Sequence, residues 1–129
     1  MQTIVKPNSG ILYPELSYQI TGLCFKVQNE LGRFAKEKQF CDRLELKFAE
    51  VSLKYGREVT IIGTGNRCDF IVDDKILLEI KAQPFIDKED YYQTQRYLKV
   101  LNLKLGLLIN FQNKYLKPQR VINFNIKDS

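Results

Sequence analysis

Three residues near the middle of the chain have the types and spacing of a metal-dependent hydrolytic site. Asp69 lies in one predicted strand, residues 67–72, while Glu79 and Lys81 lie in the next, residues 76–82. Side chains alternate along a strand, so Glu79 and Lys81 share one face. Two carboxylates supply the hard oxygen ligands that Mg²⁺ accepts, and the ion can polarise a phosphoryl oxygen and activate a bound water. A neighbouring lysine can orient that water or oppose charge on the phosphorane.

A shared site sets a condition on the loop between these two strands. A two-residue turn at Asp73 and Asp74 would place Asp69 opposite Leu78, and Glu79 would then face the other way. Asp69 and Glu79 can therefore share a face only if the loop has an odd number of residues or a bulge. The alternative interpretation is a solvent-facing strand pair with one cross-strand ion pair, because short Asp…Glu-x-Lys patterns are common.

The elements that must position these residues follow from hydrophobic periodicity. The pattern predicts helices over residues 14–31, 35–55 and 88–102, and strands over residues 59–63, 67–72, 76–82, 105–111 and 120–125. The order ααβββαββ is typical of an α/β fold with a mixed sheet flanked by helices. Alternation in residues 67–72 predicts Cys68, Phe70 and Val72 on one face and Asp69 on the other. We expect a flexible N-terminal arm, residues 1–12, and a single domain, residues 13–129.

A fourth acid, Glu37, extends the apolar stripe of the second predicted helix. It lies three residues before Phe40 and four before Cys41, which predicts an inward-facing carboxylate that reaches toward Glu79. An unpaired buried carboxylate is costly, so a metal ion or Lys81 should lie near it. The alternative is simple charge complementarity with the start of the helix.

The amino-acid composition excludes some classes of catalytic site and favours some kinds of binding partner. The 129 residues include no histidine, which excludes Ser-His-Asp hydrolases and histidine-based metal fingers. Residues 91–127 carry seven basic residues and no acid, which favours contact with a phosphodiester backbone, although a solvated helix face with a basic tail explains it equally well. Three scattered cysteines indicate buried thiols, and no apolar run approaches a membrane span. We therefore expect a cytoplasmic protein without membrane contact.

Several stretches together resemble one protein family. Residues 27–32 read Val-Gln-Asn-Glu-Leu-Gly, residues 68–70 Cys-Asp-Phe, and residues 78–82 Leu-Glu-Ile-Lys-Ala. Gln93, Tyr97 and Leu98 form a Gln-x-x-x-Tyr-Leu pattern, and residues 103–111 add Leu-Lys-Leu-Gly-Leu-Leu-Ile-Asn-Phe. From about residue 16 to residue 124, the chain resembles the GxxExxY proteins, a branch of the PD-(D/E)XK nuclease superfamily with a restriction-endonuclease-like fold.

The resemblance implies roles for individual residues. The side chains of Asp69 and Glu79 and the carbonyl of Ile80 would bind Mg²⁺ or Mn²⁺, Glu37 would hold a metal water or a second ion, and Lys81 would assist the attacking water. Support for the site or for nucleic acid would come from further residues: Gln28, Gln93, Arg96, Tyr97 and Lys99. Gln93 and Tyr97 are one helical turn apart, and the alternative for them is an ordinary polar helix edge.

Two functions remain open at this point. The first is a metal-dependent nuclease that hydrolyses nucleic acid, with DNA favoured over RNA and a homodimer among the compatible assemblies. The second is a nuclease-like binding or regulatory module with weak or no catalysis. The second is suggested by departures from the family motif, because Phe34 replaces its Gly, Phe40 its Tyr and Gln28 the family's His. The retained Asp69, Glu79 and Lys81 favour the first.

Overall fold

Residues 11–126 form a five-stranded mixed sheet flanked by three helices. The structure is a computed structural model that describes residues 11–126. In chain order the elements are α1 (Pro14–Leu31), α2 (Glu37–Glu50), β1 (Tyr55–Ile61), β2 (Asn66–Val72), β3 (Ile76–Lys81), α3 (Lys88–Leu101), β4 (Leu105–Asn110) and β5 (Gln119–Ile122). The strands follow one another across the sheet, and only β3 and β4 are parallel. The predicted fold class and element order are confirmed.

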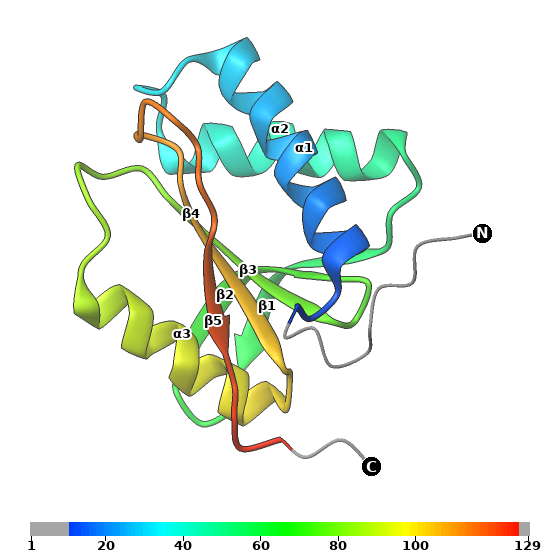
Figure 1. Ribbon diagram of the computed structural model, residues 1–129, viewed down its shortest axis with the longest axis vertical. Coiled ribbons are helices and arrows are strands. Elements are labelled where there is room, and N and C mark those ends of the chain that lie inside the picture. Colours follow the sequence, from blue (N-terminus) through cyan, green and yellow to red (C-terminus); the bar gives the residue numbers. More distant parts are fainter. Residues whose placement is uncertain (1–10, 127–129) are drawn as a thin grey trace.

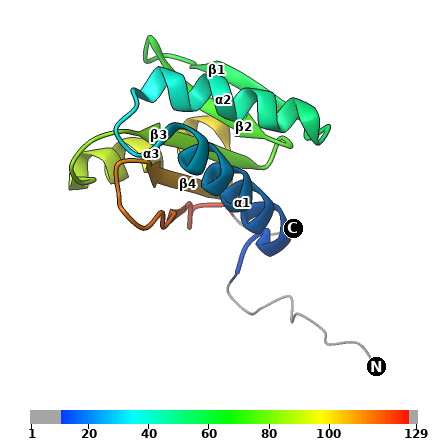
Figure 2. The ribbon, with the colours of Figure 1, turned by 90° about the horizontal axis from the view of Figure 1, so that it is seen from above.

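Two apolar cores lie on the two faces of this sheet (Figures 1 and 2). The larger core joins α1 and α2 to the sheet and includes Ile20, Leu44, Phe70 and Ile80. The smaller core joins α3 to the other face. All six residues of β4 are buried, as predicted for a strand covered on both faces. The central strands β3 and β4 are therefore a rigid base for side chains at their ends.

Local signals define α1 and α3. Pro14 opens α1, and Gly32 ends it with a φ of 77°. Asp87 caps α3 by accepting from the Asp90 backbone N–H at 2.9 Å, and the Asp90 side chain accepts from the Asp87 N–H at 3.1 Å. Asn102 ends the helix in the left-handed region. Both helices have the predicted bounds to within one residue.

The prediction for the second helix was wrong at its end. It was expected to run over residues 35–55, but α2 ends at Glu50 and Tyr55 already begins β1. The apolar spacing continues by chance through Val51 and Tyr55, whereas Ser52, with a φ of 55°, turns the chain out of the helix. The first strand is correspondingly longer than predicted, and β5 is shorter.

The remaining predictions concern the termini and the cysteines. Residues 1–10 of the predicted arm lie outside the described residues, while the carbonyl of Leu12 accepts a hydrogen bond from Arg120. Cys24, Cys41 and Cys68 are free and buried, as expected. Within residues 11–126 no helix combines the length and the apolar character needed to cross a bilayer.

Candidate active site

The β2–β3 hairpin has the odd-length loop that a shared site requires. Val72 pairs with Ile76, so the loop contains the three residues 73–75. Asp73 and Asp74 both adopt positive φ, 53° and 57°, a conformation that aspartate tolerates better than most residues. This register places Asp69 opposite Glu79. The prediction of an odd-length loop is confirmed.

Carboxylates replace the backbone ladder at the far end of this hairpin. The regular pairs stop at Phe70 and Leu78. Beyond them the Asp69 N–H donates to Oε2 of Glu79 at 3.2 Å, and the Ile80 N–H donates to Oδ2 of Asp69 at 2.7 Å. Two backbone donors are thus satisfied by the two acids, and the strands separate where those acids lie. Only the backbone of Ile80 is available to the site, because its side chain is fully buried in the larger core.

The neighbouring β1–β2 ladder is also interrupted here. The regular pairs skip Glu58 and Asp69, and Glu58 has a φ of 50°. Phe70 packs in the larger core, but Cys68 packs in the smaller core on the opposite face. The prediction that Cys68 shares a face with Phe70 and Val72 was therefore wrong, because the strand turns over around Asp69. Irregular strand geometry of this kind is common beside active sites, where it aims a side chain.

The charge balance at Glu79 suits a bound cation. Glu79 is only 5% exposed. Burial and the adjacent Asp69 carboxylate raise the pKa of Glu79 far above its usual range, while Lys81 opposes the shift. Among the described residues no cluster of three or more His, Cys, Asp or Glu side chains is arranged to hold an ion. Two carboxylates can still hold Mg²⁺, which keeps several water ligands, so the donor set fits.

Lys81 lies beside the two acids but has its own partner on α3. Its Nζ is 3.7 Å from Oδ1 of Asp90, and both side chains are less than one-fifth exposed. Asp90 also accepts from the Gln83 side chain at 2.6 Å. The amide of the buried Asn110, which pairs with Lys81 across β3 and β4, donates to the Gln83 carbonyl at 2.7 Å. These contacts hold Asp90, the carboxylate that faces the Lys81 ammonium group.

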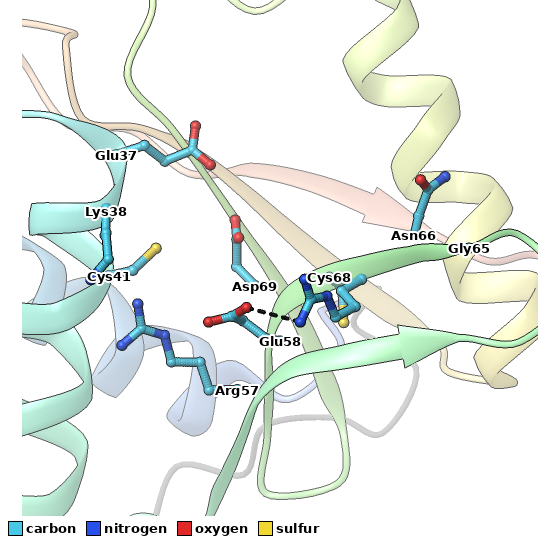
Figure 3. Close-up of a pocket in the computed structure, with 10 residues that line it drawn as sticks. Glu37, Lys38, Cys41, Arg57, Glu58, Gly65, Asn66, Cys68 and Asp69 are labelled. Carbon is cyan, nitrogen blue, oxygen red and sulfur yellow. Dashed lines mark ion pairs between the residues drawn. The ribbon is translucent and has the colours of Figure 1, made fainter.

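Glu37 is placed differently from the prediction. It is the first residue of α2 and is exposed, so it does not point into the core and contacts neither Glu79 nor Lys81 through a hydrogen bond or ion pair among the described residues. Its carboxylate nevertheless extends toward Asp69 (Figure 3). Partial loss of hydration and repulsion from Asp69 raise the pKa of Glu37, and Lys81 lowers it. Glu37 thus belongs to the rim of the site rather than to its interior.

A pocket of about 640 Å³ opens onto Asp69 between α2 and the β1–β2 hairpin (Figure 3). Basic side chains line it on three elements, namely Lys38, Arg57 and Arg67. Arg57 is firmly held, because its guanidinium pairs with both Asp42 and Glu45 at 2.7 Å. The acids Glu37, Glu58 and Asp69 also line the pocket, and Lys38 and Arg67 form ion pairs with Asp42 and Glu58. The wall of the pocket is therefore a set of ion pairs, which the sequence pattern did not predict.

Gln93 and Tyr97 line a second pocket, on the α3 side. Its volume is about 340 Å³, and the residues Asn66, Arg96 and Lys99 also line it. Tyr97 is 4% exposed, and its pKa is raised by burial and by Glu79 and lowered by a hydrogen bond with Asn66. Asn66 lines both pockets, and Tyr97 is close enough to Glu79 to be affected by its charge. A role for Gln93 and Tyr97 in the site stays a prediction.

Two further predicted contacts serve the scaffold. The Gln28 amide donates to the carbonyls of Phe111 and Asn113, each at 2.9 Å, and so holds the loop after β4. Arg120, expected among the residues that bind substrate, instead donates to Ser17 and Leu12 at the start of α1. It anchors that helix to the sheet.

Sequence reasoning missed Asp90 and Asn110. The Asp87-x-x-Asp90 spacing signals a capping box, which could have singled out Asp90. Asn110 at the end of a buried strand gives no local signal, because its role depends on the parallel register with Lys81.

Comparisons with known proteins identify a family for this chain. Residues 14–124 match the PD-(D/E)XK nuclease superfamily. No curated protein and no solved structure gives a significant match. The match covers most of the chain and includes Asp69, Glu79 and Lys81 at the separated ends of β2 and β3. The chain therefore belongs to the PD-(D/E)XK nuclease superfamily.

Proposed function

We propose that the protein is a metal-dependent nuclease of the GxxExxY branch that hydrolyses phosphodiester bonds, with DNA as its preferred substrate. One observation carries this proposal. Asp69 and Glu79 converge where β2 and β3 separate, and each accepts a backbone N–H while an open pocket reaches Asp69. Members of this superfamily typically use divalent metal ions.

Asp69, Glu79 and the carbonyl of Ile80 would hold Mg²⁺ or Mn²⁺, which supplies Lewis-acid activation of the phosphate and of a water. The chain's own groups complete the site. The Lys81 ammonium, held near Asp90, opposes negative charge on the phosphate as it is attacked. Glu37, at the rim, can accept a hydrogen bond from a water that enters through the pocket.

Substrate contacts come from two surfaces of this molecule. Lys38 and Arg67 line the pocket at Asp69, and Arg96 and Lys99 line the pocket at Tyr97. Neutralised phosphates release counterions, so binding weakens as salt rises. Of the basic segment 91–127, Arg96 and Lys99 remain proposed contacts, whereas Arg120 is hydrogen-bonded to the start of α1.

A specific feature favours the alternative, a nuclease-like binding or regulatory module. Phe40 is fully buried, and its ring stacks on Phe111 with centroids 4.4 Å apart, where the family motif has a tyrosine. The phenol hydroxyl of that motif is therefore missing. Retention of both acids and of Lys81 supports the enzyme over this module.

A gel-based cleavage assay tests the proposal. Purified protein is incubated with labelled single-stranded DNA, duplex DNA and RNA in Mg²⁺, in Mn²⁺ or in EDTA. We expect cleavage of at least one substrate that requires a metal and disappears in Asp69→Asn, which keeps a side-chain acceptor for the Ile80 N–H. Binding without cleavage by the wild type under every condition would favour the binding module instead.

A further inference from the structure

Three exposed aromatic side chains lie on the loops around the ends of β3 and β4. Phe34 follows α1 and is 73% exposed, Phe85 follows β3 and is 71% exposed, and Tyr115 follows β4 and is 79% exposed. The loops that carry them lie at one edge of the sheet (Figures 1 and 2). Lys81, at the end of β3, is at the same edge.

Hydrogen bonds fasten these loops to one another. Arg33 donates to the Gln112 carbonyl at 3.0 Å, which joins the α1–α2 loop to the β4–β5 loop. Asn110 donates to the Gln83 carbonyl at 2.7 Å, which joins β4 to the β3–α3 loop. The aromatic rings are therefore carried by loops of fixed relative position, and that position is set by the strands that carry the acids.

Two of the rings are in contact with the cationic side chain of the preceding residue. The Arg33 guanidinium carbon lies 4.6 Å from the ring centroid of Phe34, and the Lys114 Nζ lies 5.5 Å from that of Tyr115. A third cation–ring contact in the described part of the chain, between Arg57 and Phe70, lies at a buried ring. The two exposed pairs combine a flat apolar face with a positive charge.

This combination matches the chemistry of unpaired nucleotides. Proteins that bind single strands use aromatic rings on which bases stack and cationic groups that follow the backbone. Bases inside a duplex have both faces covered by neighbouring base pairs, so they cannot stack on a side chain without leaving the helix.

We propose that Phe34 with Arg33 and Tyr115 with Lys114 form a stacking platform for unpaired bases, so that the substrate is single-stranded beside the bond that is cut. The inference rests on the proposed nuclease function and names its substrate class. Phe85, on the third loop, is not part of the proposal.

The absence of tryptophan from the chain permits a direct test. Phe34→Trp and Tyr115→Trp each introduce a single reporter on the platform, and Tyr18→Trp and Phe25→Trp serve as controls at exposed positions of α1, where the side chains are 83% and 44% exposed. Tryptophan emission is recorded during titration with an oligothymidine and with a fully paired hairpin, in EDTA. We expect the oligothymidine to quench both platform reporters, the hairpin to quench neither, and the control reporters to stay unchanged.

Affinity measurements give the second arm. The platform variant Phe34→Ala/Tyr115→Ala should bind oligothymidine at least about tenfold more weakly than the wild type, while the control Tyr18→Ala/Phe25→Ala should bind like the wild type. Equal losses in the two double variants, or equal quenching by the hairpin, would overturn the inference. A changed sedimentation coefficient in the platform variant would do so as well, because the rings would then contact a second copy.

The proposed nuclease function and the proposed stacking platform are contradicted by different results. A wild type that cuts DNA in Mg²⁺ but leaves the platform reporters unquenched contradicts the platform and keeps the nuclease. Reporters that are quenched by oligothymidine in a protein that never cuts contradict the nuclease and keep the platform.

Discussion

The two ends of the β2–β3 hairpin both carry acidic residues, but these acids take part in the strand pairing at one end only. At the turn end, Val72 and Ile76 complete a regular backbone ladder, and Asp74 pairs with Lys54 in solvent, with both side chains more than two-thirds exposed. At the other end the ladder stops, and Asp69 and Glu79 accept the backbone N–H groups themselves. The strand pairing at the turn end does not involve the acidic side chains, whereas at the other end these side chains accept the hydrogen bonds of the backbone.

This difference separates folding from function within one hairpin. Exposed ion pairs contribute little to stability, so the turn acids can lose their charge at low cost when the new residue also tolerates positive φ, as asparagine does. Two adjacent carboxylates, one of them buried, destabilise a protein unless a cation or proton compensates them. The second end therefore has an arrangement that folding alone would not favour.

The largest expected effect contrasts one acid from each end. Glu79→Gln should lower the rate of metal-dependent cleavage by about a thousandfold or more, because it removes a charged ligand from the proposed site. Asp74→Asn should change the rate by no more than about twofold, because asparagine also tolerates positive φ. Initial rates on the best substrate from the cleavage assay provide the measurement. Similar rates for the two variants would abolish the functional distinction between the two ends.

The next effect concerns the position of Lys81. Lys81→Met should lower kcat by about 10²-fold while substrate affinity stays close to that of the wild type, because the lysine acts on the reacting phosphate. Asp90→Asn, which removes the partner 3.7 Å from Nζ, should lower kcat by a smaller factor. Single-turnover rates and equilibrium binding separate the two contributions. A loss that appears only in binding would assign Lys81 to substrate attraction instead.

The Glu79→Gln variant, which should lose activity, should gain stability. In EDTA at pH 7, Glu79→Gln should raise the free energy of unfolding by about 1 kcal/mol, because the glutamine keeps an acceptor and, unlike Glu79 with its raised pKa, does not have to take up a proton on folding. Urea denaturation of the variant and the wild type checks this. A destabilised variant would mean that the Glu79 charge supports the fold directly.

The smallest effect concerns the strained residue beside Asp69. Glu58→Gly should stabilise the protein by about 0.5 kcal/mol, because glycine adopts a φ of 50° without the steric cost that glutamate bears, and its larger chain entropy offsets only part of this gain. The ion pair lost with Arg67 is exposed on both sides and contributes little. Thermal unfolding at low and high salt measures the change. A loss of stability that disappears in high salt would show that the ion pair outweighs the backbone strain.

The extent to which the fold could be predicted depended on local signals. Pro14, Gly32 and the Asp87 cap define helix ends within a few residues of sequence, so α1 and α3 were predicted closely. The end of α2 has no comparable signal, because the apolar period runs on into β1 and only the positive φ of Ser52 separates the two.

The candidate site could be predicted where the even or odd spacing of residues decides which face of the sheet a side chain occupies. The even separation of Asp69 and Glu79 required an odd loop, and the register confirms it. The break at Glu58, the inverted side chain of Cys68 and the rim position of Glu37 depend on tertiary contacts between β1, β2 and α2, which a single strand pattern does not contain. Asn110 reaches the site only through the parallel pairing of β3 and β4.

Calorimetric titration with Mn²⁺ tests most directly whether Asp69 and Glu79 together hold a divalent ion. Wild-type protein and Asp69→Asn are titrated in the absence of nucleic acid. Their unfolding curves are compared first, to show that the variant is folded. We expect saturable binding to the wild type that Asp69→Asn loses, while Asp74→Asn at the turn end of the same hairpin binds like the wild type. Identical isotherms for the wild type and Asp69→Asn would contradict a metal site at the separated ends of β2 and β3.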